Sequence, residues 1–267
     1  MEIFWRLVLG HLIGDFTLQT NHIAAWKRRS VPGMLVHCGI HPVIYSMLLW
    51  NYMGQVWVQL GRLSLTGWAC VTIMFVAHFA EDQWRVWSVL KRSTPDNTFF
   101  YIWDQGVHYV VLFAMAPSIE GAAGKYGLVS YPAIAGVMHA GAGDPMSLSL
   151  WQRFLTVTQP EIWVFAAILF VLLTHFTTVS VYFIEKDYFG KDFPGDSEKY
   201  IGMAERLAVA ACFLLPGLWW LGLVSAWIVF ALALKFRGSS RHSWTSILLG
   251  NSAAVLCGAL SRLIFYS

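Results

Sequence analysis

Long apolar runs dominate the pattern of hydrophobic and polar positions along this chain. A helix needs about 20 mostly apolar residues to cross the hydrocarbon core of a bilayer. Six segments come close to that length and composition, and we predict a membrane helix in each: 3–20, 34–53, 65–84, 99–116, 162–184 and 244–265. The pattern therefore predicts an all-α, polytopic membrane protein.

A seventh apolar block, 207–234, is long for one helix and short for two. Pro216 and Gly217 interrupt it near its middle, and proline kinks or breaks a helix. Two alternatives follow, a single kinked helix or a re-entrant hairpin. The chain is then expected to contain about 6–8 membrane helices.

The pattern also divides the chain into three regions. Residues 1–116 are expected to form a four-helix membrane bundle, and residues 161–267 to supply the C-terminal membrane helices. Residues 117–160 are rich in Gly and Ala and poor in charge, which predicts an external loop with a short surface helix. A turn is expected at 193–196, inside the polar stretch 183–206.

Composition narrows the classes of protein further. Of the 267 residues, 57% are hydrophobic and 12% are charged, whereas a soluble globular chain carries about 25% charged residues. The net charge of +3 is small, and the basic residues are scattered among apolar blocks. We therefore expect membrane lipids and no nucleic acid as partners. A homo-oligomer and a larger membrane complex both stay open.

Clusters of basic residues follow the first, third and fifth predicted helices. Lys and Arg are enriched in cytoplasmic loops, so the alternation predicts an N-terminus outside the cytoplasm. Lys27, Arg28 and Arg29 form the first cluster and are most simply topology determinants. They are also candidates for holding a phosphate or an anionic headgroup of a substrate.

Histidine and aspartate occur as pairs inside the first four predicted helices. Each pair has i, i+4 spacing, which places both side chains on one face of a helix. Ionisable side chains are costly in a membrane and are by default candidate functional residues. The pairs are His11/Asp15, His37/His41, His78/Asp82 and Asp104/His108.

The direction of each helix places these pairs at one level. With a rise of about 1.5 Å per residue, all four pairs fall within one layer of the cytoplasmic leaflet. His and carboxylate ligands suit Zn, Mn or Fe, so we predict one or two divalent ions held by the eight residues. Asp15, Asp82 and Asp104 are the candidate catalytic carboxylates. The alternative is that each pair is a polar contact between helices.

Other polar residues are candidates for orienting the ligating imidazoles: Gln19, Glu81, Gln83 and Gln105. The four cysteines lie far apart without C-x-x-C spacing and are interpreted as small buried hydrophobic residues. No thiolate is expected near the His and Asp residues.

The run His11-Leu-Ile-Gly-Asp15-Phe-Thr-Leu-Gln19, the basic cluster after it and the His37/His41 helix resemble a bacterial inner-membrane family of unknown function. The resemblance covers about residues 5–115 and implies a bacterial cytoplasmic membrane. More distantly, the chain is similar to the LexA-regulated membrane-bound metal-dependent hydrolases. It lacks their His-Arg-x-x-Thr-His string, so no catalytic residue is transferred from them.

Several functions fit these patterns. The first is a membrane-embedded metal-dependent hydrolase, acting at the cytoplasmic leaflet on a lipid or lipid-linked substrate, including phosphorylated ones. The second is a haem- or chlorin-binding component or accessory subunit of a redox or photosynthetic membrane complex. The third is a metal or proton transporter that uses the His/Asp layer as its path.

Overall fold

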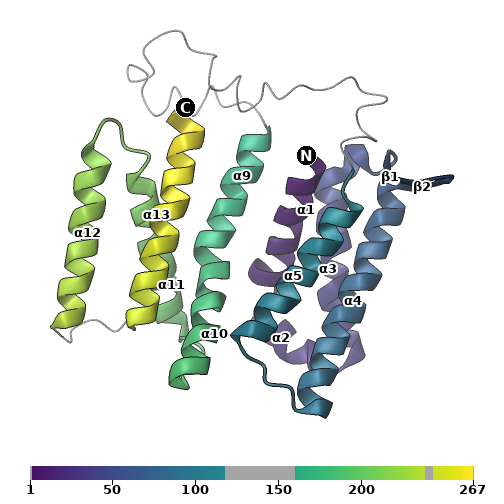
Figure 1. Ribbon diagram of the computed structural model, residues 1–267, viewed down its shortest axis with the longest axis horizontal. Helices are drawn as coiled ribbons and strands as arrows, with labels where there is room; N and C mark the ends of the chain where they lie inside the picture. The colour runs from purple at the N-terminus through teal and green to yellow at the C-terminus, as the bar shows by residue number, and fades with distance from the viewer. Residues whose placement is uncertain (1, 118–159, 238–242, 267) are drawn as a thin grey trace, which may run out of the picture. The chain divides into compact units, whose positions relative to one another are not determined.

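The computed structural model describes residues 2–117, 160–237 and 243–266. The chain divides into two compact units, Met1–Val129 and Ser130–Ser267, and each is treated by itself below (Figure 1). The described residues are predominantly helical. The predicted external loop with a surface helix, 117–160, lies almost wholly outside them.

In its described part, residues 2–117, the first unit contains four long helices, one short helix and a β-hairpin. In chain order the elements are α1 (Glu2–Leu12), the π-helix η1 (Ile13–Thr17), α2 (Asn21–Lys27), α3 (Val31–Leu49), the 3-10 turn η2 (Trp50–Tyr52), β1 (Val56–Leu60), β2 (Leu63–Thr66), α4 (Gly67–Arg92) and α5 (Thr98–Met115). Each of the four predicted N-terminal helices is therefore present.

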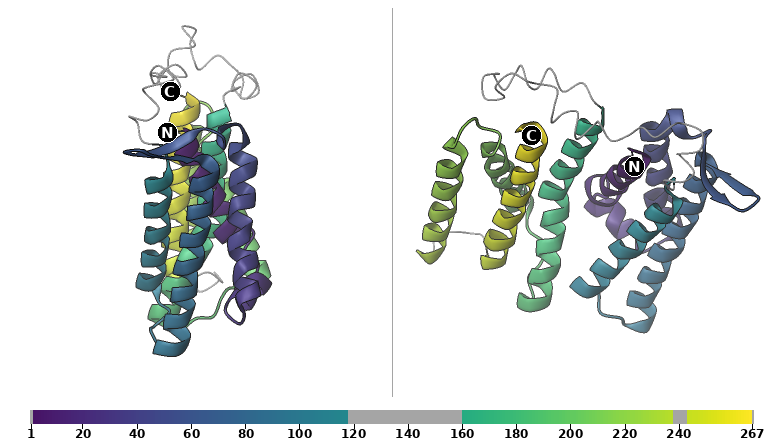
Figure 2. Two further views of the ribbon diagram at one scale, coloured as in Figure 1. Left: turned by 90° about the vertical axis from the view of Figure 1, so that its right-hand side faces the viewer. Right: turned by 45° about the horizontal axis from the view of Figure 1, so that its top comes forward.

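The helices α1, α3, α4 and α5 pack side by side: α1 contacts α3 and α5, and α4 contacts the same two helices. Figure 2 shows the hairpin at one end of this unit, and α2 lies at the other end (Figures 1 and 2). A buried apolar cluster fills the half toward the hairpin, with Leu7, Leu49, Trp57, Val71 and Leu112 among its members. The His and Asp pairs fill the half toward α2.

Polar caps, rather than hydropathy, set where these helices begin. Thr20, Ser30, Thr66 and Asn97 each accept a hydrogen bond from a backbone N–H in the first turn of α2, α3, α4 and α5. Such caps satisfy backbone donors that have no partner within the helix. This explains why the observed helix starts differ by one to three residues from the apolar boundaries.

A β-hairpin is an addition to the expected all-α fold. Strands β1 and β2 pair in antiparallel fashion with a bulge between Val56 and Val58, and Gly61 between them adopts a positive φ of 60°. A residue without Cβ favours that conformation in a tight turn. Trp57, 2% exposed, anchors the hairpin in the apolar cluster.

The second unit contains α9 (Pro160–Val171), the π-helix η3 (Leu172–Phe176), α10 (Thr177–Phe189), α11 (Asp196–Cys212), α12 (Trp219–Phe236) and α13 (Trp244–Tyr266). Helix α13 contacts α9, α10, α11 and α12. Helix α10 ends at Gly190, which has a positive φ of 63°, a common way to terminate a helix. The turn predicted at 193–196 separates α10 from α11.

The apolar block 207–234 is neither a single kinked helix nor a self-contained hairpin. Its first part completes α11, which begins at Asp196 in the polar stretch, and its second part is α12. Pro216 and Gly217 lie in the turn between them. Arg262 fixes that turn by donating to the carbonyl oxygens of Phe213, Leu215 and Gly217 at 2.7–3.1 Å.

Within the described residues, four helical segments are long and apolar enough to cross a membrane: Val31–Tyr52, Ile162–Phe189, Trp219–Phe236 and Trp244–Leu263. This supports a membrane protein. The other three predicted segments, in α1, α4 and α5, do not meet the same criterion. Together they carry His11, Asp15, His78, Asp82 and Asp104, and such polar residues lower the hydropathy of a helix.

Candidate metal centre

The four helices of the first unit bring all eight predicted residues into one buried cluster. The eight side chains are at most 8% exposed. Together with Cys38 and Glu81, they fall into three overlapping groups whose potential ligand atoms lie within 4.8 Å of one another: His11/Asp15/His41/His78, His37/Cys38/His78/Asp82 and Glu81/Asp82/Asp104/His108. Because His78 and Asp82 each belong to two groups, the three groups form one continuous layer.

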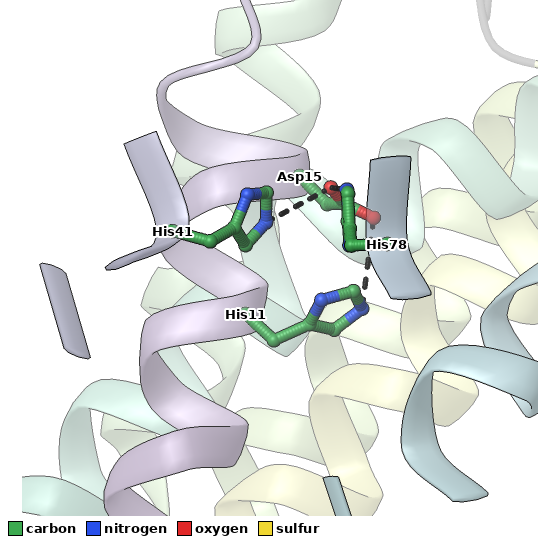
Figure 3. Close-up of side chains that lie close together, drawn as sticks. All are labelled: His11, Asp15, His41 and His78. Atoms are coloured by element: carbon green, nitrogen blue, oxygen red, sulfur yellow. Dashed lines mark ion pairs between the residues drawn. The ribbon is translucent and has the colours of Figure 1, made fainter. Parts of the chain in front are cut away.

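The Asp15 carboxylate lies at the centre of the first group. Its Oδ1 is 3.2 Å from His41 Nε2, 3.4 Å from His37 Nε2 and 3.6 Å from His78 Nε2. Its Oδ2 is 3.6 Å from His11 Nε2, and Figure 3 shows His11, His41 and His78 around it. Among the described residues, no lysine or arginine forms an ion pair with Asp15. A buried carboxylate is costly unless its negative charge is compensated. The surroundings of Asp15 therefore indicate a site for a cation.

The positions of His37, His78 and Asp15 match the edges of a coordination polyhedron. The Nε2 atoms of His37 and His78 are 3.4 Å apart, and each is 3.4–3.6 Å from Asp15 Oδ1. Tetrahedral Zn has N and O ligands at about 2.0–2.2 Å, which places neighbouring ligand atoms roughly 3.3–3.6 Å apart. The three atoms therefore have the separations of ligands that share one metal ion.

Gln105 on α5 orients part of this group. Its Nε2 donates to Asp15 Oδ2 at 3.1 Å and to Asp104 Oδ2 at 3.2 Å, which leaves Oε1 to accept from His11 Nε2 at 3.2 Å. His11 then carries its proton on Nε2. Gln105 and His11 thus act as supports for Asp15, and His37, His41 and His78 are the better candidate ligands.

Asp82 supplies the carboxylate of the second group. Its Oδ2 lies 3.0 Å from His37 Nε2, and it also accepts from Lys27 Nζ at 2.9 Å. Lys27 Nζ is 3.1 Å from the same His37 nitrogen. Burial by itself would lower the pKa of Lys27, but the carboxylates of Asp82 and Asp15 outweigh that effect and raise it. A positive charge is therefore already held at this edge of the layer.

Cys38 corrects the expectation that no thiol lies near the layer. It is fully buried, and its sulfur belongs to the group of His37, His78 and Asp82. Its proximity follows from its place on α3, directly after His37. Mixed N, O and S donors suit Zn better than Mn.

In the third group, the carboxylate of Asp104 forms an ion pair with an arginine. Asp104, 2% exposed, accepts from Arg85 NH1 at 2.8 Å, and Arg85 NH2 donates to Asp96 at 2.9 Å. His108 Nε2 lies 3.4 Å from a carboxylate oxygen of Glu81. The imidazole ring of His108 stacks on the ring of His78, with the two centroids 4.2 Å apart.

Many buried polar atoms of the layer have no hydrogen-bond partner among the described residues. They include Asp15 Oδ1, His41 Nε2, His108 Nε2, Asp104 Oδ1 and both carboxylate oxygens of Glu81. His41 Nε2 and Asp15 Oδ1 are close in distance, but their angles do not form a hydrogen bond. Buried polar atoms are normally satisfied, so such a concentration indicates a ligand.

The space among the imidazoles is small. A cavity of about 10 Å³ is lined by four of the histidines, His11, His41, His78 and His108, together with Tyr45 and Leu112. That volume corresponds to about one water-sized sphere. It accommodates an ion or a water molecule and is far smaller than a tetrapyrrole.

The remaining predicted residues lie at the edge of the layer or outside it. Arg28, whose side chain is 56% exposed, pairs with Asp96 at 3.5 Å, and Arg29 is exposed. Gln19 has a buried Oε1 without a hydrogen-bond partner. Gln83 is half-buried and has no contact with the layer among the described interactions.

Lys27 and Arg85 belong to the basic clusters that follow the first and third predicted helices, yet both enter the layer. For Arg85 a signal was present, because it follows Asp82 by three residues and so shares its helical face. Lys27 offered no comparable signal. It reaches the layer because η1 and the short helix α2, capped by Thr20, turn the chain back toward α3.

Gly14 in η1 leaves room for His41, and we expect Gly14→Ala to weaken metal binding. A Cβ at Gly14 would lie 2.4 Å from His41 Nε2, so we expect the imidazole to leave its position 3.2 Å from Asp15 Oδ1. Outer-shell changes cost about 10- to 100-fold in metal affinity, and a loss of that order is expected in a chelator competition. Gly39→Ala on α3, where a Cβ meets nothing within 4 Å, is the matched control. Equal affinity of Gly14→Ala and wild type would contradict the expectation.

The family match found by comparison with known proteins lies in the first unit. Residues 3–128 match the family described as "Protein of unknown function (DUF3307)". The match covers less than half of the chain, but it includes all eight His and Asp residues. No curated protein and no solved structure shows significant similarity to the chain. The similarity to metal-dependent hydrolases expected from sequence has no support in these comparisons.

Proposed function

We propose that the first unit is a membrane-embedded metal centre that hydrolyses a lipid or lipid-linked substrate. The observation that carries the proposal is the set of three buried atoms, Asp15 Oδ1, His37 Nε2 and His78 Nε2, at mutual distances of 3.4–3.6 Å. His41 and Asp82 complete a set of five candidate ligands. We propose Zn, Mn or Fe as the metal, and Cys38 favours Zn or Fe over Mn.

A second ion is proposed at Glu81, Asp82, Asp104 and His108. Asp82 belongs to this group and to the group with His37 and His78, so it can bridge two ions. Arg85 and Gln105 donate to Oδ2 of Asp104, and its Oδ1 has no hydrogen-bond partner in the described part of the chain. The proposal is therefore one or two divalent ions.

A divalent metal supplies a bound water with a pKa near 7 and polarises an ester or phosphoryl oxygen. The protein residues supply the rest. When only the first ion is bound, a carboxylate that does not bind metal would accept the proton of the water, and Asp104 is the best candidate because its Oδ1 is buried and has no hydrogen-bond partner among the described residues. Asp15 and Asp82 are then ligands.

The basic residues of α2 are proposed to bind the substrate headgroup. Lys27 Nζ reaches Asp82 and His37 from α2, while Arg28 and Arg29 are exposed beside it. A cation entering the layer would compete with Lys27 for Asp82 and His37. Lys27 would then be available for an anionic headgroup.

Membrane topology supports an opening toward the cytoplasm. We propose that α1, α3, α4 and α5 form a four-helix membrane bundle, followed by four crossings made by α9–α10, α11, α12 and α13. With the N-terminus outside, Lys27, Arg92, Lys191 and Lys235 all lie on the cytoplasmic side, as the positive-inside rule requires. The α11–α12 turn, 213–218, carries no charged residue and lies outside.

Among the alternatives, a haem or chlorin fits the geometry less well than an ion, because the cavity among the histidines is only about 10 Å³. A transporter is the second candidate. His78 belongs to the first and second groups, and Asp82 belongs to the second and third. Such shared ligands would let a cation pass from one group to the next. Uptake of Zn²⁺ or Mn²⁺ into proteoliposomes would favour transport over hydrolysis.

The hydrolase is tested with proteoliposomes that contain phosphatidylethanolamine, phosphatidylglycerol, cardiolipin and an isoprenyl diphosphate, with products followed by mass spectrometry. We expect turnover of one lipid by the metal-loaded protein. The triple variant His37→Ala/His41→Ala/Asp82→Ala should lose about 10²-fold or more, since even outer-shell changes at metal sites cost 10- to 100-fold.

The matched control is His22→Ala/Asp192→Ala, which removes exposed residues of the same types and should retain turnover. Equal turnover by the triple variant would contradict the proposal. So would the absence of turnover of every lipid by wild-type protein that contains its metal.

A further inference from the structure

A second buried site lies in the second unit, around Arg206 on α11. Arg206 is 8% exposed, and a buried arginine in a membrane protein is a candidate functional residue. Among the described residues, no carboxylate forms an ion pair with it. The adjacent Glu205 interacts with Arg206 electrostatically, but no hydrogen bond of the guanidinium goes to a carboxylate of the described chain.

Part of the guanidinium has a structural role. Nε donates to the carbonyl oxygen of Leu173 at 2.8 Å, and NH2 donates to the carbonyl oxygen of Thr174 at 3.1 Å and to Thr178 Oγ1 at 2.6 Å. Leu173 and Thr174 belong to the π-helix η3. These three donors hold α11 against the irregular turn of the neighbouring helix.

Two donors remain. A guanidinium has five N–H groups, and the two on NH1 have no partner among the described residues. NH1 lies beside Gly250 of α13, 3.8 Å from where a Cβ of that residue would be. Arg206 and Gly250 both line a cavity of about 80 Å³ between α11, α12 and α13. The unused donors thus lie at the wall of a cavity.

The cavity offers further polar groups. Ser246 and Asn251 line it from α13. Asn251 Oδ1 accepts a hydrogen bond from Trp227 Nε1 at 3.2 Å, and Asn251 Nδ2 donates one to the Ile247 carbonyl oxygen. These two bonds fix the amide and leave its second N–H available for a ligand. Because one water needs about 10–15 Å³, the cavity has room for a larger group.

We propose that this cavity binds one phosphate group, with Arg206 NH1 as its principal donor and Ser246 and Asn251 as secondary donors. Arginine recognises phosphate through paired N–H groups. Glu205 also lines the cavity, and its negative charge disfavours a diphosphate. Two sources share this chemistry, the headgroup of an anionic lipid and free inorganic phosphate.

The position of the cavity connects it with the membrane surface. Its lining includes Leu234 near the end of α12 and Ser246 near the start of α13. Lys235 follows Leu234 directly, and Arg237 lies two residues further along the chain. Basic residues at the end of membrane helices attract anionic headgroups at the cytoplasmic face.

The test uses the full-length protein in detergent and native mass spectrometry. Phosphatidic acid, phosphatidylglycerol and diacylglycerol, which lacks phosphate, are added separately. We expect one phosphate-containing lipid per chain to be retained and diacylglycerol not to be retained. Competition by millimolar inorganic phosphate identifies free phosphate as the ligand, and resistance to competition identifies the lipid.

Ala231→Phe on α12 fills the cavity without removing a hydrogen bond of Arg206, and it should weaken retention about tenfold or more. The matched control is Ala226→Phe, on an exposed position of the same helix, which should bind as wild type does. Arg206→Lys keeps the charge but loses the paired N–H groups and should also bind more weakly.

Wild-type retention by folded Ala231→Phe, or no retention of any phosphate compound by the wild type, would overturn the proposal. The metal centre is independent of this outcome, because every residue of the phosphate site belongs to the second unit.

Discussion

Replacing His78 by alanine is expected to lower metal affinity by at least about 10²-fold, the upper range for outer-shell changes at metal sites. His78 has the largest expected effect because two of the three groups share it. Its Nε2 lies 3.4 Å from His37 Nε2 and 3.6 Å from Asp15 Oδ1. Without this imidazole, neither group retains its full set of nitrogen donors.

The measurement is metal content after dialysis against a graded series of chelators, on protein purified in detergent. His22→Ala is the control, since His22 is exposed on α2 and is not a member of any of the three groups. Circular dichroism establishes that each variant is folded. Equal metal content of folded His78→Ala and wild type would show that His78 is not a ligand.

Arg85→Ala is expected to destabilise the first unit by about 3–5 kcal/mol, the cost of leaving a buried charge without its partner. Arg85 donates to Asp104, which is 2% exposed, and to Asp96. Gln105 also donates to Asp104, but an amide does not neutralise a carboxylate. The effect should appear as a lower midpoint of thermal unfolding in detergent.

Two further variants separate charge from packing. Arg85→Ala/Asp104→Asn removes both charges and should recover much of the lost stability. Arg92→Ala, an exposed position on the same helix, should change the midpoint little. If Arg85→Ala unfolds at the wild-type temperature, Arg85 does not hold the charge of Asp104 in the folded protein.

The layer itself could be predicted because its signal is periodic. The i, i+4 spacing of each pair fixes a helical face, and the alternating direction of consecutive helices fixes a level. Asp15 and His41, 26 residues apart in sequence, are therefore in contact as expected. The pairs needed no information beyond helix geometry and chain direction.

Features that depend on the path of the chain between helices were missed. Lys27 enters the layer only because α2 folds back against α3. The β-hairpin was missed because its alternating pattern, Val56, Val58 and Leu60 before Gly61, is only five residues long and lies between much longer apolar helices. Cys38 was treated as a core residue, and its nearness to Asp82 depends on how α3 and α4 pack.

The break in 207–234 illustrates a different limit. Pro216 and Gly217 mark the turn correctly, but the length of α11 depends on where it begins. That start lies at Asp196, in a stretch too polar to suggest a membrane helix. Arg206 holds this helix against η3 by donating to carbonyl oxygens of Leu173 and Thr174, a tertiary interaction with no sequence signature.

X-ray absorption spectroscopy of the purified protein at the edge of its bound metal is the decisive test of the metal centre. We predict N and O ligands at about 2.0–2.1 Å from the metal, outer-shell scattering from at least two imidazoles, and loss of the signal in His37→Ala/His78→Ala. A folded wild-type protein that contains no metal, or a metal without imidazole ligands, would contradict it.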